Sequence, residues 1–438
     1  MFKKVFPLSA ILSLRFLGLF LVLPVISIYA LELKGATPFL IGVVVGGYAL
    51  TQAIFQVPFG TMSDKIGRKP TLLVGLVIFL IGSVICAYSS DIYTLMLGRF
   101  LQGAGAIGSV ITAMISDLVE EEIRGKAMAI MGASIALSFA LAMGLGPVIG
   151  ASYGVDSLFI LTAVFAVLAI ILLFTKVPTP PKIKHIYHEK AKTSDILKDP
   201  NLLNMIIINA MQKGLMTFAF VLIPIILTGD TFAWQKSDLY MAYLPAMILG
   251  LAAMGPAAVF GEKRNKPKQI FLLSIMLFIG SFLIMGLTTS STVFVVGVVM
   301  FFMAFNMMEP LVQSMITKFA KVHQKGAALG IANSAAYFAT FIGGSAAGAL
   351  LGTGERETIG ISIAFIAFLW LLWTLRLQNP IKHSHLYMSQ DIVDMDKLTN
   401  LEHEHIAEWY INDSEKKVII KYVSDAIDEE TLKANISK

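Results

Sequence analysis

The sequence predicts an all-α membrane protein built from two six-helix halves, followed by a small α+β domain at the C-terminal end. Three observations point to this fold class. Hydrophobic residues make up 56% of the 438 residues and charged residues only 14%, which excludes an ordinary water-soluble protein. Apolar stretches of about 20 residues, each long enough to cross a bilayer as a helix, recur along most of the chain. From Leu386 onward the sequence carries twelve acids against six lysines and no further long apolar stretch.

Apolar runs of the length that a bilayer requires occur about twelve times. The predicted spans are 7–30, 38–60, 70–89, 92–116, 125–150, 155–176, 202–228, 238–261, 268–288, 291–318, 325–350 and 357–376. Lys3 and Lys4 precede the first run, but it is too long for a signal-peptide core and more spans follow, so we expect an uncleaved helix. The single cysteine, Cys86, lies within a span and excludes an internal disulfide or a cysteine metal cluster.

Lysine and arginine residues in the connections predict the orientation, because cytoplasmic loops are enriched in them. One side of the predicted bundle holds most of these cations: Lys3, Lys4, Lys65, Arg68, Lys69, Arg124, Lys126, the lysines of 176–198, Lys263–Lys268, Lys318–Lys325, Arg376 and Lys382. The other side holds little beyond Lys34, Lys236 and Arg356. We therefore expect a multi-pass protein of the inner (cell) membrane with both termini in the cytoplasm.

A proline-containing, lysine-rich connection divides the two predicted halves. The expected domains are an N-terminal bundle at 1–176, a cytoplasmic linker at 177–200, a C-terminal bundle at 201–382 and a small cytoplasmic domain at 383–438. The halves resemble each other weakly. The segment 261–267 repeats the glycine, cations and proline of the segment 60–70, without its aspartate, and Arg124–Ala127 has a counterpart in Lys325–Ala328.

The segment 60–70 is a polar stretch between two long apolar runs. Glycines at Gly60 and Gly67 let the backbone turn sharply between helices, and Arg68 and Lys69 mark the turn as cytoplasmic. Asp64 is the unusual residue, because a plain basic membrane loop needs no carboxylate at a fixed distance from a Gly-Arg-Lys triplet. The spacing Gly-x-x-x-Asp-Lys-x-Gly-Arg-Lys therefore indicates a functional loop.

Asp117 stands near the end of the fourth predicted span, at the cytoplasmic side. A carboxylate at a helix C-terminus opposes the helix dipole. We therefore expect Asp117 to have a cationic partner, and Arg68 is the obvious candidate.

Four charged residues fall in the interior of predicted spans, away from the span ends: Arg15, Arg99, Lys213 and Glu309. Such residues are costly in a membrane and usually functional. No histidine falls in any span, so protons that move through the membrane domain on side chains would be carried by carboxylates and by Lys213. The alternative is that Arg15, Arg99 and Glu309 pair as structural ions between helices.

The fifth predicted span contains Gly144, Gly146, Pro147 and Gly150. Small residues permit close helix contact, and the proline removes a backbone hydrogen bond and bends the helix. Helix packing alone is the simpler interpretation of this segment.

The C-terminal segment predicts a β-α-β-β-α unit of about 50 residues, marginally stable by itself. Its leading strand is expected at 386–389, its first helix at 394–402 and its hairpin at 405–411 and 417–423, with Asp428 capping a last short helix. The acidity of this tail favours docking on the basic cytoplasmic face near the linker. Its histidines are His383, His385, His403 and His405; we interpret them as a solvated face, and expect neither a metal site nor a cofactor.

Taken together, these residues resemble the bacterial drug:proton antiporters of the major facilitator superfamily, specifically the YajR-like transporters. The resemblance is carried by Ser13–Gly18, the segment 60–70, Gly98–Gly105, Phe305–Glu309 and the acidic tail. It implies the major facilitator fold, with a substrate cavity between the two halves near the membrane midplane. It also implies that the tail is a ferredoxin-like domain, although a fourth strand is missing here.

The resemblance implies roles for several of these residues. Asp64 would meet the positive N-terminal end of the eleventh helix, while Arg68 pairs with Asp117, and together they would form a cytoplasmic latch in the outward-open state. Arg99 would take part in proton coupling. The segment Gly144–Gly150 resembles the antiporter motif of exporters, which uptake symporters generally lack.

We therefore expect a proton-coupled transporter that exports small apolar or amphipathic molecules by alternating access. Its expected partners are a small-molecule substrate, protons and the lipid bilayer; we expect a monomer, and the acidic tail argues against nucleic acid. One alternative is an uptake symporter or facilitator on the same scaffold, and another is a membrane sensor whose tail binds a ligand. An enzyme is not expected, because the sequence shows no nucleophile–base set and no phosphate loop.

Overall fold

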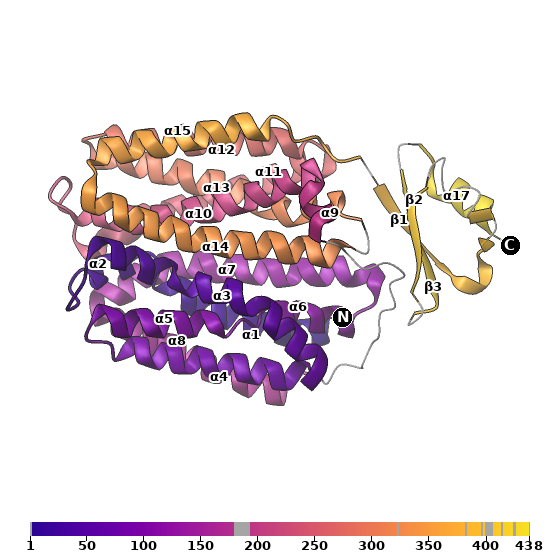
Figure 1. The fold of residues 1–438 in the computed structure, drawn as a ribbon, viewed down its shortest axis with the longest axis horizontal. Helices are drawn as coiled ribbons and strands as arrows, with labels where there is room; N and C mark the ends of the chain where they lie inside the picture. Colours follow the sequence, from indigo (N-terminus) through magenta and orange to yellow (C-terminus); the bar gives the residue numbers. More distant parts are fainter. Residues whose placement is uncertain are drawn as a thin grey trace.

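The structure is a computed structural model that describes residues 2–178, 193–321, 324–381, 383–395, 397–398, 406–412, 415–423 and 426–437. Within this part of the chain, twelve helices are long and apolar enough to cross a membrane, which confirms the predicted membrane domain. The helices run side by side with roughly parallel axes, and the small C-terminal domain stands beyond one end of the bundle (Figure 1). The predicted linker 177–200 falls partly on residues outside the described ranges.

The helices of the first half follow the predicted spans closely, with two exceptions. They are α1 (Phe2–Leu21), α2 (Ile26–Ala30), α3 (Pro38–Ile66), α4 (Arg68–Ala87), α5 (Ile92–Ala104), α6 (Gly108–Leu118), α7 (Glu121–Tyr153) and α8 (Val155–Thr175). The span expected at 7–30 is broken between α1 and α2, around Pro24, which has no backbone N–H to donate. The span expected at 92–116 is broken at Gly105, where an added Cβ would lie 2.3 Å from the carbonyl oxygen of Gly75.

The second half repeats this pattern of six long helices. Its elements are α9 (Thr193–Lys198), α10 (Pro200–Thr228), η1 (Lys236–Leu239), α11 (Tyr240–Ala258), η2 (Val259–Lys263), α12 (Pro267–Leu287), α13 (Ser291–Phe319), α14 (Lys325–Thr353) and α15 (Arg356–Thr374). The N-terminus and the C-terminal domain lie at the same end of the bundle, which we call the terminal end (Figure 1). We call the opposite end, where α3 begins and α14 finishes, the far end.

Close contact between α3 and α14 joins the two halves toward the far end. An added Cβ at Gly42 would lie 2.1 Å from the carbonyl oxygen of Gly344, and one at Gly348 would lie 2.3 Å from that of Pro38. At Gly46 it would lie 3.0 Å from the Cα atom of Phe341. Only glycine permits such an approach of two helices. We call Gly42, Gly46, Gly344 and Gly348 the far-end seal.

Toward the terminal end, glycines of the same region have open space around them. An added Cβ at Gly326 or Gly330 of α14 would meet nothing within 4 Å, and the same holds for Gly125 and Gly132 of α7. The two halves are thus in close contact between α3 and α14 toward the far end, whereas these four glycines of α7 and α14 have no close neighbour toward the terminal end.

The C-terminal domain contains a three-stranded antiparallel sheet with strand order β1-β3-β2 in its described part. The elements are β1 (His383–Ser389), β2 (Ile406–Asn412), β3 (Lys417–Val423) and α17 (Glu429–Ile436). The three predicted strands and the last helix are present, and Asp428 accepts a hydrogen bond from the backbone N–H of Thr431 as the helix cap. The helix expected at 394–402 falls largely outside the described residues, as do His403 and His405.

The tail contacts the membrane domain through Lys417, which lies 3.6 Å from Glu120 and 3.7 Å from Glu122, at the start of α7. We expected acidic residues of the tail to contact a basic face of the membrane domain. At this point a basic residue of the tail contacts acidic residues of the membrane domain instead. The reason is local. The connection between α6 and α7 carries successive glutamates on an otherwise basic surface, and two of them attract a lysine of the sheet.

Candidate functional site

The segment 60–70 forms a sharp corner between α3 and α4 at the terminal end. Gly67 has φ of +102°, a conformation that favours glycine, and it separates Ile66, the last residue of α3, from Arg68, the first of α4. Arg68 donates from Nε to Asp117 at 2.9 Å and from Nη1 to Asp64 at 2.6 Å. The structure thus brings Arg68 and Asp117 together, as expected from the sequence.

The side chain of Asp64 is 66% exposed and faces Arg68 rather than the N-terminal end of α14. The contact with α14 that the resemblance implies for Asp64 in the outward-open state is therefore not seen among the described residues of this structure. Gly60 lies in the last turns of α3, and Lys69 lies in the first turn of α4, so both flank the corner.

Arg15 on α1 is completely buried at mid-span. Its Nη2 atom donates to the side-chain oxygen of Gln52 at 3.1 Å and, at 3.5 Å, to the backbone carbonyl of Gln102. The guanidinium lies over the rings of Phe16 and Phe79, with 5.7 and 5.3 Å to the ring centroids. Its Nε and Nη1 atoms are buried without a hydrogen-bond partner in the described part of the chain.

Arg99 on α5 is also completely buried, and neutral oxygens accept its hydrogen bonds. Its Nη1 atom donates to the side chain of Gln102 at 2.8 Å, and Nε and Nη2 donate to the carbonyls of Val44 and Val45 at 3.2 and 3.4 Å. The guanidinium lies 4.7 Å from the ring centroid of Tyr48. Gln52 and Gln102 were not among the predicted site residues, although an amide inside an apolar span was a usable signal.

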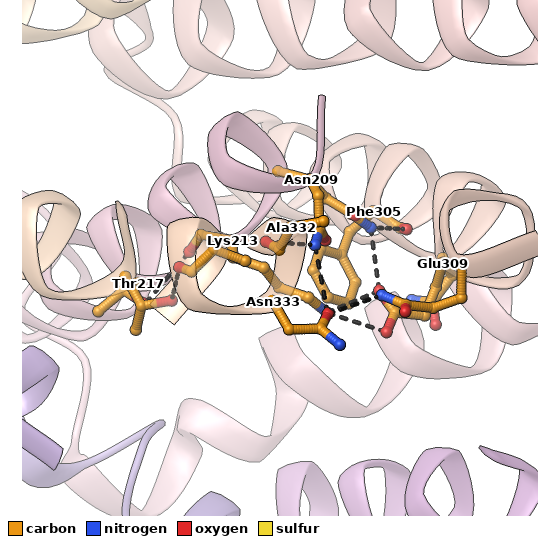
Figure 2. Close-up of polar contacts among 12 residues, drawn as sticks. Asn209, Lys213, Thr217, Phe305, Glu309, Ala332 and Asn333 are labelled. Atoms are coloured by element: carbon orange, nitrogen blue, oxygen red, sulfur yellow. Dashed lines mark hydrogen bonds and ion pairs between the residues drawn. The ribbon is translucent and has the colours of Figure 1, made fainter. Parts of the chain in front are cut away.

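Lys213 on α10 and Glu309 on α13 form an ion pair in the second half (Figure 2). The Lys213 ammonium donates to both carboxylate oxygens, at 2.9 and 2.7 Å, and lies 4.7 Å from the ring centroid of Phe305. Gln212 adds a hydrogen bond of 3.1 Å from its amide to the same carboxylate. The side chains of Lys213 and Glu309 remain 24% and 39% exposed, so the pair faces accessible space.

Asparagines extend this network onto α14. The side-chain amide of Asn209 donates to the carbonyl of Ala332 at 3.0 Å and to the side chain of Asn333 at 3.5 Å (Figure 2). Gln313 on α13 donates to Asn333 at 3.0 Å. Sequence reasoning did not single out these amides, whose signal is again a polar residue at helical spacing within an apolar run.

Tyr337 on α14 links the charged groups of the two halves. It lies within electrostatic reach of Arg15 in the first half and of Glu309 in the second. Gly344 and Gly348 of the far-end seal lie on the same helix as Tyr337.

The arrangement changes the partner that one alternative from the sequence gave to Glu309. Glu309 does not pair with Arg15 or Arg99 as a structural ion between helices; among the described residues its cationic partner is Lys213. The two arginines belong to the first half, whereas Lys213 and Glu309 both belong to the second, so depth in the membrane alone did not identify the pair.

The segment Gly144–Gly150 of α7 packs against the break between α1 and α2. An added Cβ at Gly146 would lie 2.2 Å from the carbonyl oxygen of Leu21, and Tyr29 donates a hydrogen bond to the carbonyl of Gly150. An added Cβ at Gly144 would lie 3.5 Å from the side chain of Leu244 in the second half. Pro147 lies within the helix. Close packing is therefore part of what these small residues do.

Comparisons with known proteins agree with this geometry. The family model of the Major Facilitator Superfamily matches residues 8–344. The inner membrane transport protein YajR of Escherichia coli is 35% identical over 424 residues, 94% of this chain and 92% of that protein. The quinolone resistance protein NorA of Staphylococcus aureus is 26% identical over 379 residues, 83% of this chain and 94% of that protein.

Solved structures share the fold at low sequence identity. A D-xylose–proton symporter has a TM-score of 0.70 at 17% identity, covering 86% of this chain and 98% of the symporter chain. A mutant of the nucleoside transporter NupG has a TM-score of 0.69 at 13% identity, covering 85% of this chain and 98% of the NupG chain. The family is one of transporters of small molecules, not of enzymes. Since the family model covers most of the chain and YajR is matched along nearly its whole length, this chain is a multi-pass membrane transporter of the major facilitator superfamily and belongs with its YajR-like members.

Proposed function

We propose that this transporter exports small amphipathic molecules in exchange for protons by alternating access, with both termini in the cytoplasm. The basic residues of the terminal end, including Arg68 and Lys69, support that orientation. With this orientation, the state described here is inward-open: the far-end seal closes the outer side, and Asp64 is released from α14. The similarity to NorA, named for quinolone resistance, supports export of small molecules.

The observation that carries the proposal is the Lys213–Glu309 pair. Glu309 is the one acidic residue of the sequence that lies at the middle of a span, and its side chain is partly exposed. A carboxylate in this position can bind and release a proton as access alternates. Protonation removes the charge of Glu309 and weakens its contact with Lys213. The net charge of the Lys213–Glu309 pair can therefore differ between the inward-open and outward-open states. The membrane potential contributes about 2.3 kcal/mol per charge per 100 mV, enough to drive such an exchange.

The latch supplies the second part of the cycle. When the terminal end closes, Asp64 would leave Arg68 and meet the N-terminal end of α14, while Arg68 keeps its bond to Asp117. A carboxylate at a helix N-terminus is worth about 0.3–2 kcal/mol, sufficient to shift a two-state population about tenfold. We propose that Arg99 and Arg15 act in coupling through their positive charge, and that Gly144–Gly150 lets α7 move against α1.

Transport direction tests this proposal. Inside-out vesicles from cells that express the protein are acidified by respiration, and accumulation of fluorescent substrates from a chemically diverse panel is followed. Accumulation that collapses with the proton gradient is expected for an exporter. A substrate that leaves such vesicles with the protons would instead identify an uptake symporter, and flux without a gradient would identify a facilitator.

A further inference from the structure

A cavity lies inside the second half, toward the far end of the bundle. It has a volume of about 190 Å³ and is lined by residues of α10, α12, α13, α14 and α15 and of the connection before α15. Lys213 and Glu309 do not line it, and none of its described lining residues belongs to the first half. The cavity is therefore separate from the region between the two halves.

The wall of this cavity is apolar except at its outer end. On α10 the lining runs from Ala219 to Ile226, a distance of about 10 Å along the helix axis. Since α10 ends at the far end, Ile226 lies near the outer end of the cavity and Ala219 lies deeper in the bundle. Arg356, the first residue of α15, is the one charged residue among the described residues that line the cavity. A cation at the outer end is thus followed inward by apolar walls.

Arg356 is held in place by one edge of its guanidinium. Its Nε atom donates to the carbonyl of Gly286 at 3.1 Å, and Nη2 donates to the carbonyl of Thr288. The Nη1 atom, on the other side of the group, is buried and has no hydrogen-bond partner within the described ranges. Glu355 and Glu357 are exposed, and in the described part of the chain neither forms an ion pair with Arg356. Both the charge and one donor group of Arg356 remain available.

The unpaired donor and the size of the cavity together restrict what can occupy it. A buried donor without an acceptor is costly, and a guanidinium binds carboxylate oxygens strongly because the hydrogen bond is charge-assisted. A cavity of about 150 Å³ takes a ligand the size of benzene, whereas pockets for drug-sized ligands measure about 300–1,000 Å³. The present cavity, at about 190 Å³, therefore has room for one short apolar chain but not for a drug-sized body.

We propose that this cavity binds a medium-chain carboxylate, with its chain against Ala219 and Leu222 and its carboxylate accepting a hydrogen bond from Nη1 of Arg356. Each methylene group that leaves water strengthens binding roughly fourfold. The chain therefore supplies most of the affinity, and Arg356 supplies the preference for an anion. This binding site is additional to the transport site proposed above.

Three probes test this inference on the purified full-length protein. Octanoate and octylammonium share a chain and differ in the sign of their charge, while acetate has the carboxylate without the chain. Binding is measured at pH 8 by equilibrium dialysis in dodecyl maltoside, whose headgroup carries no oxyanion, with empty micelles subtracted. We expect saturable binding of octanoate, at least about tenfold tighter than that of either other probe. Octanoate binding that does not saturate, or equal affinity for octylammonium or acetate, would overturn the inference.

Variants assign the binding to this cavity. Arg356→Gln should weaken octanoate binding at least about tenfold, whereas Arg376→Gln, which changes an exposed arginine of the terminal end, should leave it unchanged. Ala219→Leu fills the cavity and keeps Arg356, so it should also weaken binding at least about tenfold. Ala252→Leu makes the same change at an exposed position of α11 and is its control.

The Ala219→Leu and Ala252→Leu pair decides the matter if Arg356→Gln does not fold, because both variants keep the hydrogen bonds of Arg356. A folded Ala219→Leu protein that binds octanoate like the wild type would show that the cavity is not the site. Native mass spectrometry examines the other occupant, a phospholipid. A phospholipid retained by the wild type and by Arg376→Gln, but lost in Arg356→Gln, would overturn the assignment to a free carboxylate.

Discussion

Lys213 and Glu309, which lie on neighbouring helices of the second half, form an ion pair at 2.7 Å in which both side chains keep part of their surface accessible. Full burial would fix the pair as a structural element, because separating it would leave a charge without solvent or partner. Partial exposure leaves the carboxylate accessible, as the proton exchange that we propose requires. The side-chain amide of Gln212 donates to the same carboxylate at 3.1 Å and helps to hold it in place.

The first prediction concerns this carboxylate. Glu309→Gln keeps the shape and the hydrogen bond from Gln212 but removes the titratable group. Flux in proteoliposomes should fall at least about tenfold or lose its dependence on pH. Glu262→Gln serves as the control, because Glu262 pairs with Lys318 near the terminal end and should leave the pH profile unchanged. A folded Glu309→Gln protein with the pH dependence of the wild type would take Glu309 out of the coupling path.

The second prediction concerns the latch. Asp64→Asn removes the charge while preserving shape, and since Asp64 is largely exposed in the present state, expression and thermal stability should change little. Transport should slow about tenfold, because the state closed at the terminal end loses its contact with α14. Asp195→Asn, which neutralises an exposed acid of the terminal end, is the matched control. Normal export by Asp64→Asn under a full proton gradient would show that the latch role does not apply here.

The third prediction concerns the far-end seal. Gly42→Ala adds a Cβ that would lie 2.1 Å from the carbonyl oxygen of Gly344, which forces α3 and α14 apart. In a Cys86→Ser background, a cysteine introduced at Thr340, which is 2% exposed, should react with a water-soluble maleimide at least about tenfold faster. The labelling should be faster because the far-end seal no longer shields the introduced cysteine from water.

Gly330→Ala is the control for the seal, because it makes the same change on α14 where an added Cβ meets nothing within 4 Å. It should leave labelling unchanged. If Gly42→Ala labels as slowly as Gly330→Ala, the glycine contacts do not determine closure of the far end.

The membrane spans could be predicted from the sequence because a bilayer leaves few alternatives: backbone polar groups must be paired within each segment, so a long apolar run becomes a helix. The breaks near Pro24 and at Gly105 could not. Proline and glycine are tolerated inside membrane helices, and only the structure shows that the helix ends just before Gly105, which approaches Gly75 closely.

The candidate site was predicted unevenly for a similar reason. Arg68 and Asp117 could be paired from the sequence because both lie at the same boundary and the dipole of the helix demands a cation. The partner of Glu309 could not be found in this way. Lys213 is 96 residues away along the chain, and Arg15 and Arg99 also lie in the interior of predicted spans. Which helix faces meet depends on packing, and that information is not in the periodicity of any one span.

The fourth prediction concerns the tail, which contacts the membrane domain through Lys417 and the glutamates Glu120 and Glu122. All three side chains are at least 27% exposed, so the contact is weak and sensitive to salt, worth about 0–1 kcal/mol per pair. Truncation after Lys382 should leave a folded transporter with an altered rate. In the intact protein, higher ionic strength should increase protease cutting between Gln378 and Leu386.

Charge reversal distinguishes this docking from a tail that is merely tethered. Lys417→Glu should raise the rate of cutting even at low salt, because it places a third carboxylate opposite Glu120 and Glu122, whereas Lys416→Glu makes the same charge change one residue away and should have little effect. Combining Lys417→Glu with Glu120→Lys and Glu122→Lys should restore protection. The contact site also lies only three residues beyond Asp117, the partner of Arg68. If release of the tail changes the transport rate, it should therefore act through the connection between α6 and α7. Protease cutting that is fast and does not depend on salt or on these charge changes would show that the tail does not dock.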